Sequence, residues 1–239
     1  MPTIPSAGSL LFAAALTLFA ATASAQHAGD ILLSVPEPGG KLVTSGGDFT
    51  GEFAGRVFEG VMPPSLPYEI DAPGFDSLTG TFSAGDEIRF DFARELLYWN
   101  GSSLATPAGR MTVSYGPSKQ ASVGGTDFEG LSGYVISAAD SNGAFHKHPF
   151  FSLPDTAADG VYGLTLTLGP GDGTSGFTTS DPFLITMLVG NPGDYTAGVA
   201  ALADAAFAAP VPEPAAGLLA AAAAVLAGAR CGRRRRGTA

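Results

Sequence analysis

The sequence predicts a mostly β protein, an antiparallel β-sandwich or jelly roll, between two terminal segments of different character. Three observations predict this fold class. The 239 residues include 33 Gly and 18 Pro, which break helix interiors and exclude a helical bundle or a coiled coil. Short apolar runs recur between turn residues, as in all-β domains. A hydrophobic content of 45% excludes general disorder, and the lone Cys excludes a disulfide scaffold.

Residues 1–25 have the composition of a signal peptide. No charged side chain precedes Asp30, and the apolar run 10–21 has the length of a signal-peptide core, shorter than a spanning helix needs. Ala23 and Ala25 are the small residues expected before a cleavage site. No Lys or Arg precedes the apolar run, which departs from the usual pattern. We expect an exported chain, with an uncleaved anchor or a buried helix as the alternatives.

The segment 26–190 is expected to form the β-sandwich ectodomain. In 161–168, Leu and Tyr alternate with Thr and Gly, and this period of two is typical of a strand. Asn142-Gly143 predicts a hairpin turn, and 94–99 is a candidate short helical turn. The candidate strands are 31–35, 41–44, 48–58, 111–115, 133–138, 146–153, 161–168 and 182–189.

The end of the chain combines three unlike features in a fixed order. An Ala-rich stretch, 191–210, is expected to be a spacer or a short helix that leads to the tail 211–239. The tail has Pro212-Glu213-Pro214, then the uncharged run 215–229, which at about 1.5 Å per residue spans less than a bilayer core unless flanking arginines snorkel. We expect 215–229 to be a transmembrane helix. The basic cluster that follows stays cytoplasmic by the positive-inside rule; it comprises Arg230, Arg233, Arg234, Arg235 and Arg236.

This tail closely resembles the PEP-CTERM sorting signal, which consists of Pro-Glu-Pro, an apolar helix and a basic cluster. The resemblance implies that an exosortase recognises the tail in the membrane, cuts near Pro212-Glu213-Pro214, and releases the protein or transfers it to the cell surface. A plain tail anchor and a buried Ala-rich helix are the alternatives. Cys231 falls inside the tail, and we expect it to have no separate role.

The charge of the segment between the two ends is strongly negative. Residues 26–210 carry 21 acidic and 7 basic side chains, a net charge of −14. Such a surface repels nucleic acid backbones and anionic lipids, so we expect neither as a partner. Cations are the natural partner, and the alternative is a charge that only keeps an exported protein soluble.

The three histidines, His27, His146 and His148, are the candidate metal ligands. In a strand, residues i and i+2 lie on one face, so the imidazoles of His146 and His148 can converge on one divalent ion, zinc above all. His27 can join them if the first strand pairs next to the His146 strand, and Asp30, another carboxylate or water can complete the shell. The alternative is a surface pair with an unrelated third His.

A second resemblance concerns the same histidines. The segments 146–153, 160–164 and 180–183 are similar to surface-anchored bacterial β-domains that carry a His near the mature N-terminus, a His-x-His followed by aromatic residues, and a Gly-x-Tyr strand. Some members are associated with zinc or other metal homeostasis, which implies a metal role for His146, His148 and His27. Pro149 interrupts the aromatic pattern of that family.

Together these observations predict an exported, non-enzymatic surface protein that binds a divalent metal. Its expected partners are the secretion machinery, an exosortase, and the membrane before processing. The alternatives are a structural or adhesive matrix component that contacts extracellular polysaccharide, or a carbohydrate-binding module that stacks sugars on Tyr68, Tyr98 and Trp99. No nucleophile elbow, phosphate-binding loop or EF-hand spacing occurs in the sequence, so we do not expect an enzyme.

Overall fold

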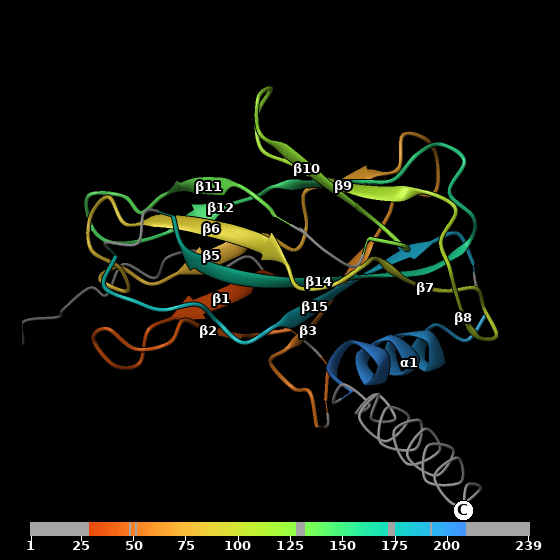
Figure 1. The fold of residues 1–239 in the computed structure, drawn as a ribbon, viewed down its shortest axis with the longest axis horizontal. Helices are drawn as coiled ribbons and strands as arrows, with labels where there is room; N and C mark the ends of the chain where they lie inside the picture. Colours follow the sequence, from red (N-terminus) through yellow and green to blue (C-terminus); the bar gives the residue numbers. More distant parts are fainter. Residues whose placement is uncertain are drawn as a thin grey trace, which may run out of the picture.

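The computed structural model describes residues 29–47, 49–50, 52–127, 132–171, 175–191 and 193–208. Within these residues the chain is mostly β, with three sheets and the helix α1 (Tyr195–Phe207), as Figure 1 shows. The expected signal peptide, His27 and the tail 211–239, with its expected transmembrane segment, lie outside the described residues. No helix in the described part of the chain is long and apolar enough to cross a membrane.

The largest sheet has seven strands. They are β3 (Val57–Val61), β6 (Glu87–Phe92), β7 (Leu97–Trp99), β8 (Leu104–Ala105), β11 (Val135–Ala138), β14 (Gly160–Pro170) and β15 (Phe183–Val189). The main path runs β11-β6-β14-β15-β3. The long strand β14 pairs with β15 on one side and, on the other, with β7 through its first half and β6 through its second.

Two four-stranded sheets complete the β structure. The first has the order β12-β5-β1-β2, and its strands are β1 (Ile31–Ser34), β2 (Val43–Ser45), β5 (Phe75–Ser77) and β12 (His146–Lys147). The second has the order β10-β9-β13-β4, and its strands are β4 (Glu69–Ile70), β9 (Arg110–Ser114), β10 (Gln120–Gly124) and β13 (Phe150–Ser152).

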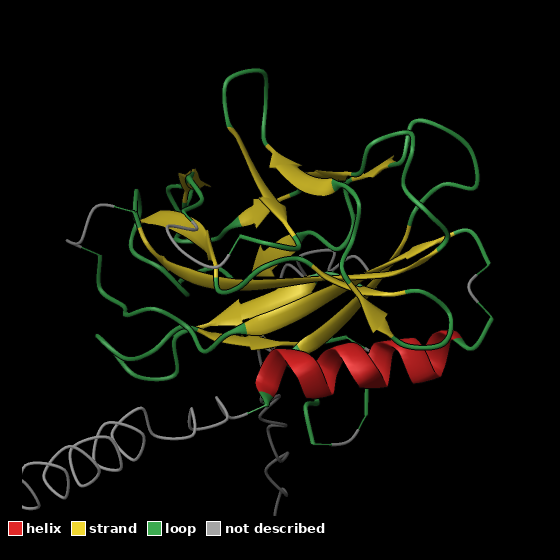
Figure 2. Cartoon of the chain, turned by 45° about the vertical axis from the view of Figure 1, so that its right-hand side comes forward, coloured by secondary structure: helices red, strands yellow, loops and turns green. Residues whose placement is uncertain are grey.

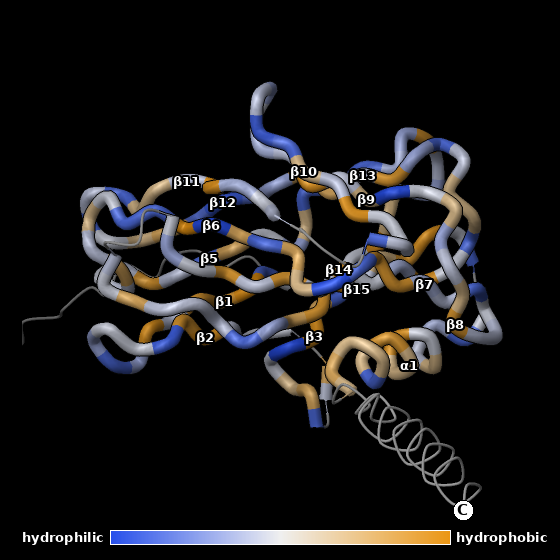
Figure 3. The backbone as a smooth tube through the Cα atoms, viewed as in Figure 1, coloured by the Kyte–Doolittle hydropathy of each residue, from blue (hydrophilic) through white to orange (hydrophobic). Residues whose placement is uncertain are grey.

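Both faces of β14 are buried, and they contact different partners. Tyr162, Leu164 and Leu166 belong to the main core, which also contains residues of both four-stranded sheets. Val161 on the opposite face packs in a second cluster with Leu202 of α1. Because side chains alternate along a strand, the seven-stranded sheet separates the two clusters. Figure 2 shows α1 lying along one side of the strands, and Figure 3 shows the apolar residues concentrated in the strands and on the helix.

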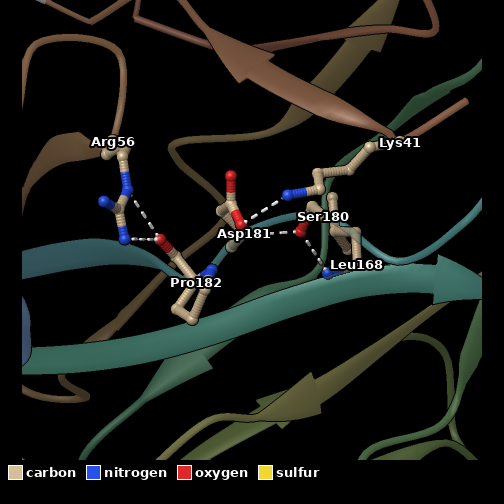
Figure 4. Close-up of polar contacts among 6 residues, drawn as sticks. All are labelled: Lys41, Arg56, Leu168, Ser180, Asp181 and Pro182. Carbon is tan, nitrogen blue, oxygen red and sulfur yellow. Dashed lines mark hydrogen bonds and ion pairs between the residues drawn. The ribbon is translucent and has the colours of Figure 1, made fainter.

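Polar contacts fix the segment that leads into β15 (Figure 4). The Arg56 guanidinium donates to the Pro182 carbonyl oxygen at 3.0 Å from Nε and 2.7 Å from Nη2. Ser180 Oγ accepts from the backbone N–H of Leu168 at 3.0 Å. Lys41 Nζ lies 2.8 Å from Asp181 Oδ1, but both side chains are exposed, so this pair stabilises the fold by less than about 1 kcal/mol.

The predicted β class is confirmed, whereas a purely antiparallel arrangement is not. The β1–β5 and β15–β3 pairs are parallel. The expected strand over 48–58 is largely wrong, because 52–56 forms turns and β3 begins only at Val57. The side chain of Phe53 in these turns packs beside the helix, against the ring of Phe207 at 4.8 Å between centroids.

Other boundaries also differ from expectation. The expected strand 146–153 is two strands, because the chain changes sheets at His148-Pro149: β12 pairs with β5, whereas β13 pairs with β9 and β4. Asn142-Gly143 forms a turn, but the strands on either side lie in different sheets and do not form a hairpin. The expected helical turn over 94–99 contains β7. Of the two alternatives for 191–210, a short helix is observed.

Candidate metal centre

The candidate centre lies at one end of the sheet β12-β5-β1-β2. Asp30 immediately precedes β1, and His146 is the first residue of β12. The central strand β5 pairs with both, parallel to β1 and antiparallel to β12. This pairing brings an N-terminal residue next to a segment more than a hundred positions later in the chain.

Asp30, His146 and His148 each place one potential ligand atom within 4.8 Å of the others. The two imidazole rings have centroids 4.9 Å apart, so the pair converges as its spacing predicts. His148 Nε2 lies 3.4 Å from Asp30 Oδ2. Ligand atoms of a tetrahedral zinc site, each about 2.0–2.1 Å from the ion, lie roughly 3.3–3.4 Å from one another. The three residues could therefore hold a metal ion.

The ring of His148 is held in a defined orientation. Its Nδ1–H donates to the Asp71 carbonyl oxygen at 2.9 Å. A carbonyl oxygen only accepts, so Nδ1 carries the proton, and Nε2 lies on the Asp30 side. The ring also packs directly on Gly74, where a Cβ would lie 2.5–2.8 Å from three ring atoms. Only glycine leaves this room for the imidazole.

Asp30 is a buried carboxylate, with 5% of the residue exposed. Its Oδ1 accepts from the backbone N–H of Gly74 at 2.9 Å, whereas Oδ2 has no hydrogen-bond partner among the described residues. Burying a carboxylate oxygen without compensation is costly. Asp30 Oδ2 and His148 Nε2 lie 3.4 Å apart. At this separation a protonated ring forms an ion pair with the carboxylate, and a neutral ring can share a cation with it.

Access to the centre is from the side of His146. Its side chain is 45% exposed, compared with 24% for His148 and 4% for Asp30. An ion from solvent can therefore reach the group past the outer imidazole. The arrangement is suited to binding a small cation: two imidazoles and a carboxylate are the donors that zinc and other divalent transition metals accept.

The third predicted ligand, His27, lies outside the described residues. The condition for its participation, that the first strand pairs directly with the His146 strand, is not met, since β5 lies between β1 and β12. Asp30, which sequence reasoning had offered only as one way to complete the shell, is instead a central member. Sequence reasoning missed three contributions of the segment Asp71–Asp76. The Asp71 carbonyl accepts from His148, Gly74 leaves room for the His148 ring, and Asp76 is a second buried carboxylate.

The aromatic residues considered for sugar stacking do not form an exposed platform. Trp99 and Tyr98 are buried, at 5% and 8% exposure, and Tyr68 packs against the main core. Trp99 belongs to the cluster beneath α1. A carbohydrate-binding face built on Trp99 is therefore contradicted by the structure.

Comparison with known proteins yields no relative for this chain. No family model matches it, no curated protein sequence matches it, and no solved structure matches it.

Proposed function

We propose that this chain is an exported, non-enzymatic β-domain protein that binds a divalent transition metal, zinc first among them, through Asp30, His146 and His148. One observation carries the proposal: His148 Nε2 and the buried Asp30 Oδ2 lie 3.4 Å apart, the separation expected of two ligands on one tetrahedral ion. The strongly acidic composition of 26–210 supports a cationic partner.

The position of Asp30 adds support that is independent of the His-x-His spacing. Its carboxylate comes from the first described strand region, and Gly74 fixes it through both a side-chain and a backbone contact, since Ile31 N–H also donates to the Gly74 carbonyl at 2.9 Å. A surface pair of histidines with no role would not require a buried carboxylate beside it. His27 stands three residues before Asp30 in the sequence, and on that ground alone it remains a proposed additional ligand.

The test is a calorimetric titration of the purified chain with zinc at pH 7.5, beside a His146→Ala/His148→Ala double variant. We expect one zinc per wild-type chain and no stoichiometric binding by the variant. A Lys147→Ala variant is the matched control, because this residue lies between the two histidines and offers no ligand to the group. Absence of binding by the wild type, or equal binding by both, would contradict the proposal.

We propose further that the chain reaches the cell surface through its two ends. The support is the sequence: a signal peptide with Ala23 and Ala25 before the cleavage site, and a PEP-CTERM-like tail containing Pro212-Glu213-Pro214 and Arg233–Arg236. The residues that precede the tail form α1, which packs against the sheet, so cleavage near the Pro-Glu-Pro would release a β domain with its helix intact. A Glu213→Ala variant that is processed and sorted like the wild type would contradict exosortase recognition.

A further inference from the structure

Asp76 is a second buried carboxylate next to the candidate metal centre. It lies in the central strand β5, is 1% exposed, and neither of its side-chain oxygens has a hydrogen-bond partner among the described residues. Buried carboxylates are ordinarily paired or hydrogen-bonded, because their charged form loses hydration. Asp76 therefore requires a compensating donor or cation.

The nearest candidate for that donor is His146. In the antiparallel β12–β5 pair, His146 and Asp76 are directly opposite each other, and opposite residues of two paired strands project on the same face. His146 Nδ1 lies 3.3 Å from Asp76 Oδ1. A neutral imidazole with its proton on Nδ1 would donate toward this carboxylate and leave the lone pair on Nε2 for a metal.

We propose that Asp76 is a positioning residue of the metal centre: it accepts the Nδ1–H proton of His146 and thereby directs Nε2 of that ring to the ion held by Asp30 and His148. This inference rests on the proposed metal-binding function. Metal-binding histidines commonly donate their other N–H to a carboxylate or a carbonyl, which fixes the tautomer and the ring orientation. The Asp71 carbonyl oxygen already accepts the Nδ1–H of His148, so each of the two rings would donate its Nδ1–H to an oxygen.

The charges of the side chains around the proposed centre favour a divalent ion. Two carboxylates, Asp30 and Asp76, and two neutral imidazoles carry a total charge of −2, which a divalent cation neutralises. Since both carboxylates are almost completely buried, a residual charge of either sign in this region would be poorly solvated. The centre should therefore favour divalent over monovalent ions.

The test compares wild type, Asp76→Asn and Asp76→Ala in the purified chain. Zinc affinity is measured by competition with a chelating indicator, and the metal-free melting temperature is measured beside it. We expect one zinc per chain in all three, with affinity weakened about 10-fold in Asp76→Asn and up to about 100-fold in Asp76→Ala. We also expect a metal-free melting temperature in Asp76→Asn no lower than in wild type, because the substitution removes a buried charge.

A nuclear magnetic resonance readout separates positioning from a general structural effect. In the zinc-bound wild type, both His146 and His148 should show a protected Nδ1–H proton and an Nε2 bound to metal. In Asp76→Ala the His146 proton should lose its protection, whereas the His148 proton, held by Asp71, should not change. Wild-type zinc affinity in both variants, or complete loss of zinc, would overturn the positioning role; failure of wild type itself to bind zinc would instead overturn the metal function on which it rests.

Discussion

Gly74→Ala is the sharpest probe of the candidate metal centre, because it leaves all proposed ligands in place. A Cβ at this position would lie 2.5 Å from Cε1, 2.7 Å from Nδ1 and 2.8 Å from Nε2 of His148. These atoms belong to a ring rather than to the end of a flexible chain, so the ring as a whole must move. Gly74 has no left-handed backbone conformation, so the effect of the methyl group is one of contact and not of backbone strain.

The size of the effect follows from these distances. Restoring an ordinary contact of about 3.4 Å requires the His148 ring to move by about 0.6 to 0.9 Å. Metal–ligand distances tolerate deviations of only about 0.2 Å. We therefore expect the affinity for zinc to fall about 10- to 100-fold, comparable with loss of a residue that orients a ligand, which corresponds to about 1.4 to 2.7 kcal/mol of binding free energy.

The assay is a competition titration of wild type and Gly74→Ala with zinc in the presence of a chelator of known affinity. Gly176→Ala is the matched control, since a Cβ at Gly176 would meet no atom within 4 Å and its φ is not positive. Melting temperatures of the metal-free proteins show whether each variant is folded. Wild-type affinity in a folded Gly74→Ala chain, or an equal loss in Gly176→Ala, would refute the argument that the packing of the His148 ring on Gly74 positions it for zinc.

Three further predictions concern the centre and the packing around it. Asp30→Asn should abolish tight zinc binding without lowering the metal-free melting temperature, because Oδ2 is buried without a hydrogen-bond partner among the described residues; a large drop in that temperature would contradict this. Leu202→Ala, in the fully buried face of α1, should lower the free energy of unfolding by about 2–5 kcal/mol, whereas Leu78→Ala, at a site 61% exposed, should change it little in urea denaturation. Burial raises the pKa of Tyr162 to about 12, with a smaller contribution from Tyr98. Its phenol therefore stabilises the fold fully below about pH 10, the pKa of an unfolded tyrosine, and this contribution is lost as the pH rises toward 12. Tyr162→Phe should reduce the loss of stability between pH 9 and pH 11.5, and an unchanged pH dependence would contradict the assignment.

The strands with the strongest period of two were predictable from the sequence. In β14 and β15 the alternating apolar residues form one face of the main core. On the opposite face, Val161, Leu184 and Leu188 pack in the cluster that includes α1. The strand β6 has the same alternation, with Ile88, Phe90 and Phe92 buried, but it was not among the candidate strands. Arg89 and Asp91 form an ion pair at 2.8 Å on the outer face, which accounts for charges inside a strand.

Short strands and sheet changes were beyond sequence reasoning. Strands β4, β8 and β12 contain two residues each, too few to show a period. The split of 146–153 depends on which partners β12 and β13 find, and pairing between distant segments leaves no local pattern. The parallel pairing of β1 with β5 likewise joins segments about forty residues apart.

The candidate site likewise has one part that local spacing predicts and another that depends on long-range strand pairing. The convergence of His146 and His148 follows from local spacing, and it was predicted. The contributions of Asp76 and Gly74 follow from long-range pairing within the sheet β12-β5-β1-β2. Asp76 was one acidic residue among the 21 of segment 26–210, and nothing in the neighbouring sequence distinguishes a carboxylate that becomes buried from one that stays in solvent.

The most direct test of the proposed metal centre is the zinc X-ray absorption spectrum of the loaded chain. The proposed ligands predict one zinc per chain with only nitrogen and oxygen neighbours at about 2.0–2.2 Å. They also predict outer-shell scattering from two imidazoles, which should disappear in the His146→Ala/His148→Ala variant. A sulfur neighbour at about 2.3 Å would assign the bound ion to Cys231, and a spectrum unchanged in the double variant would place the ion elsewhere; either result would contradict the proposed centre.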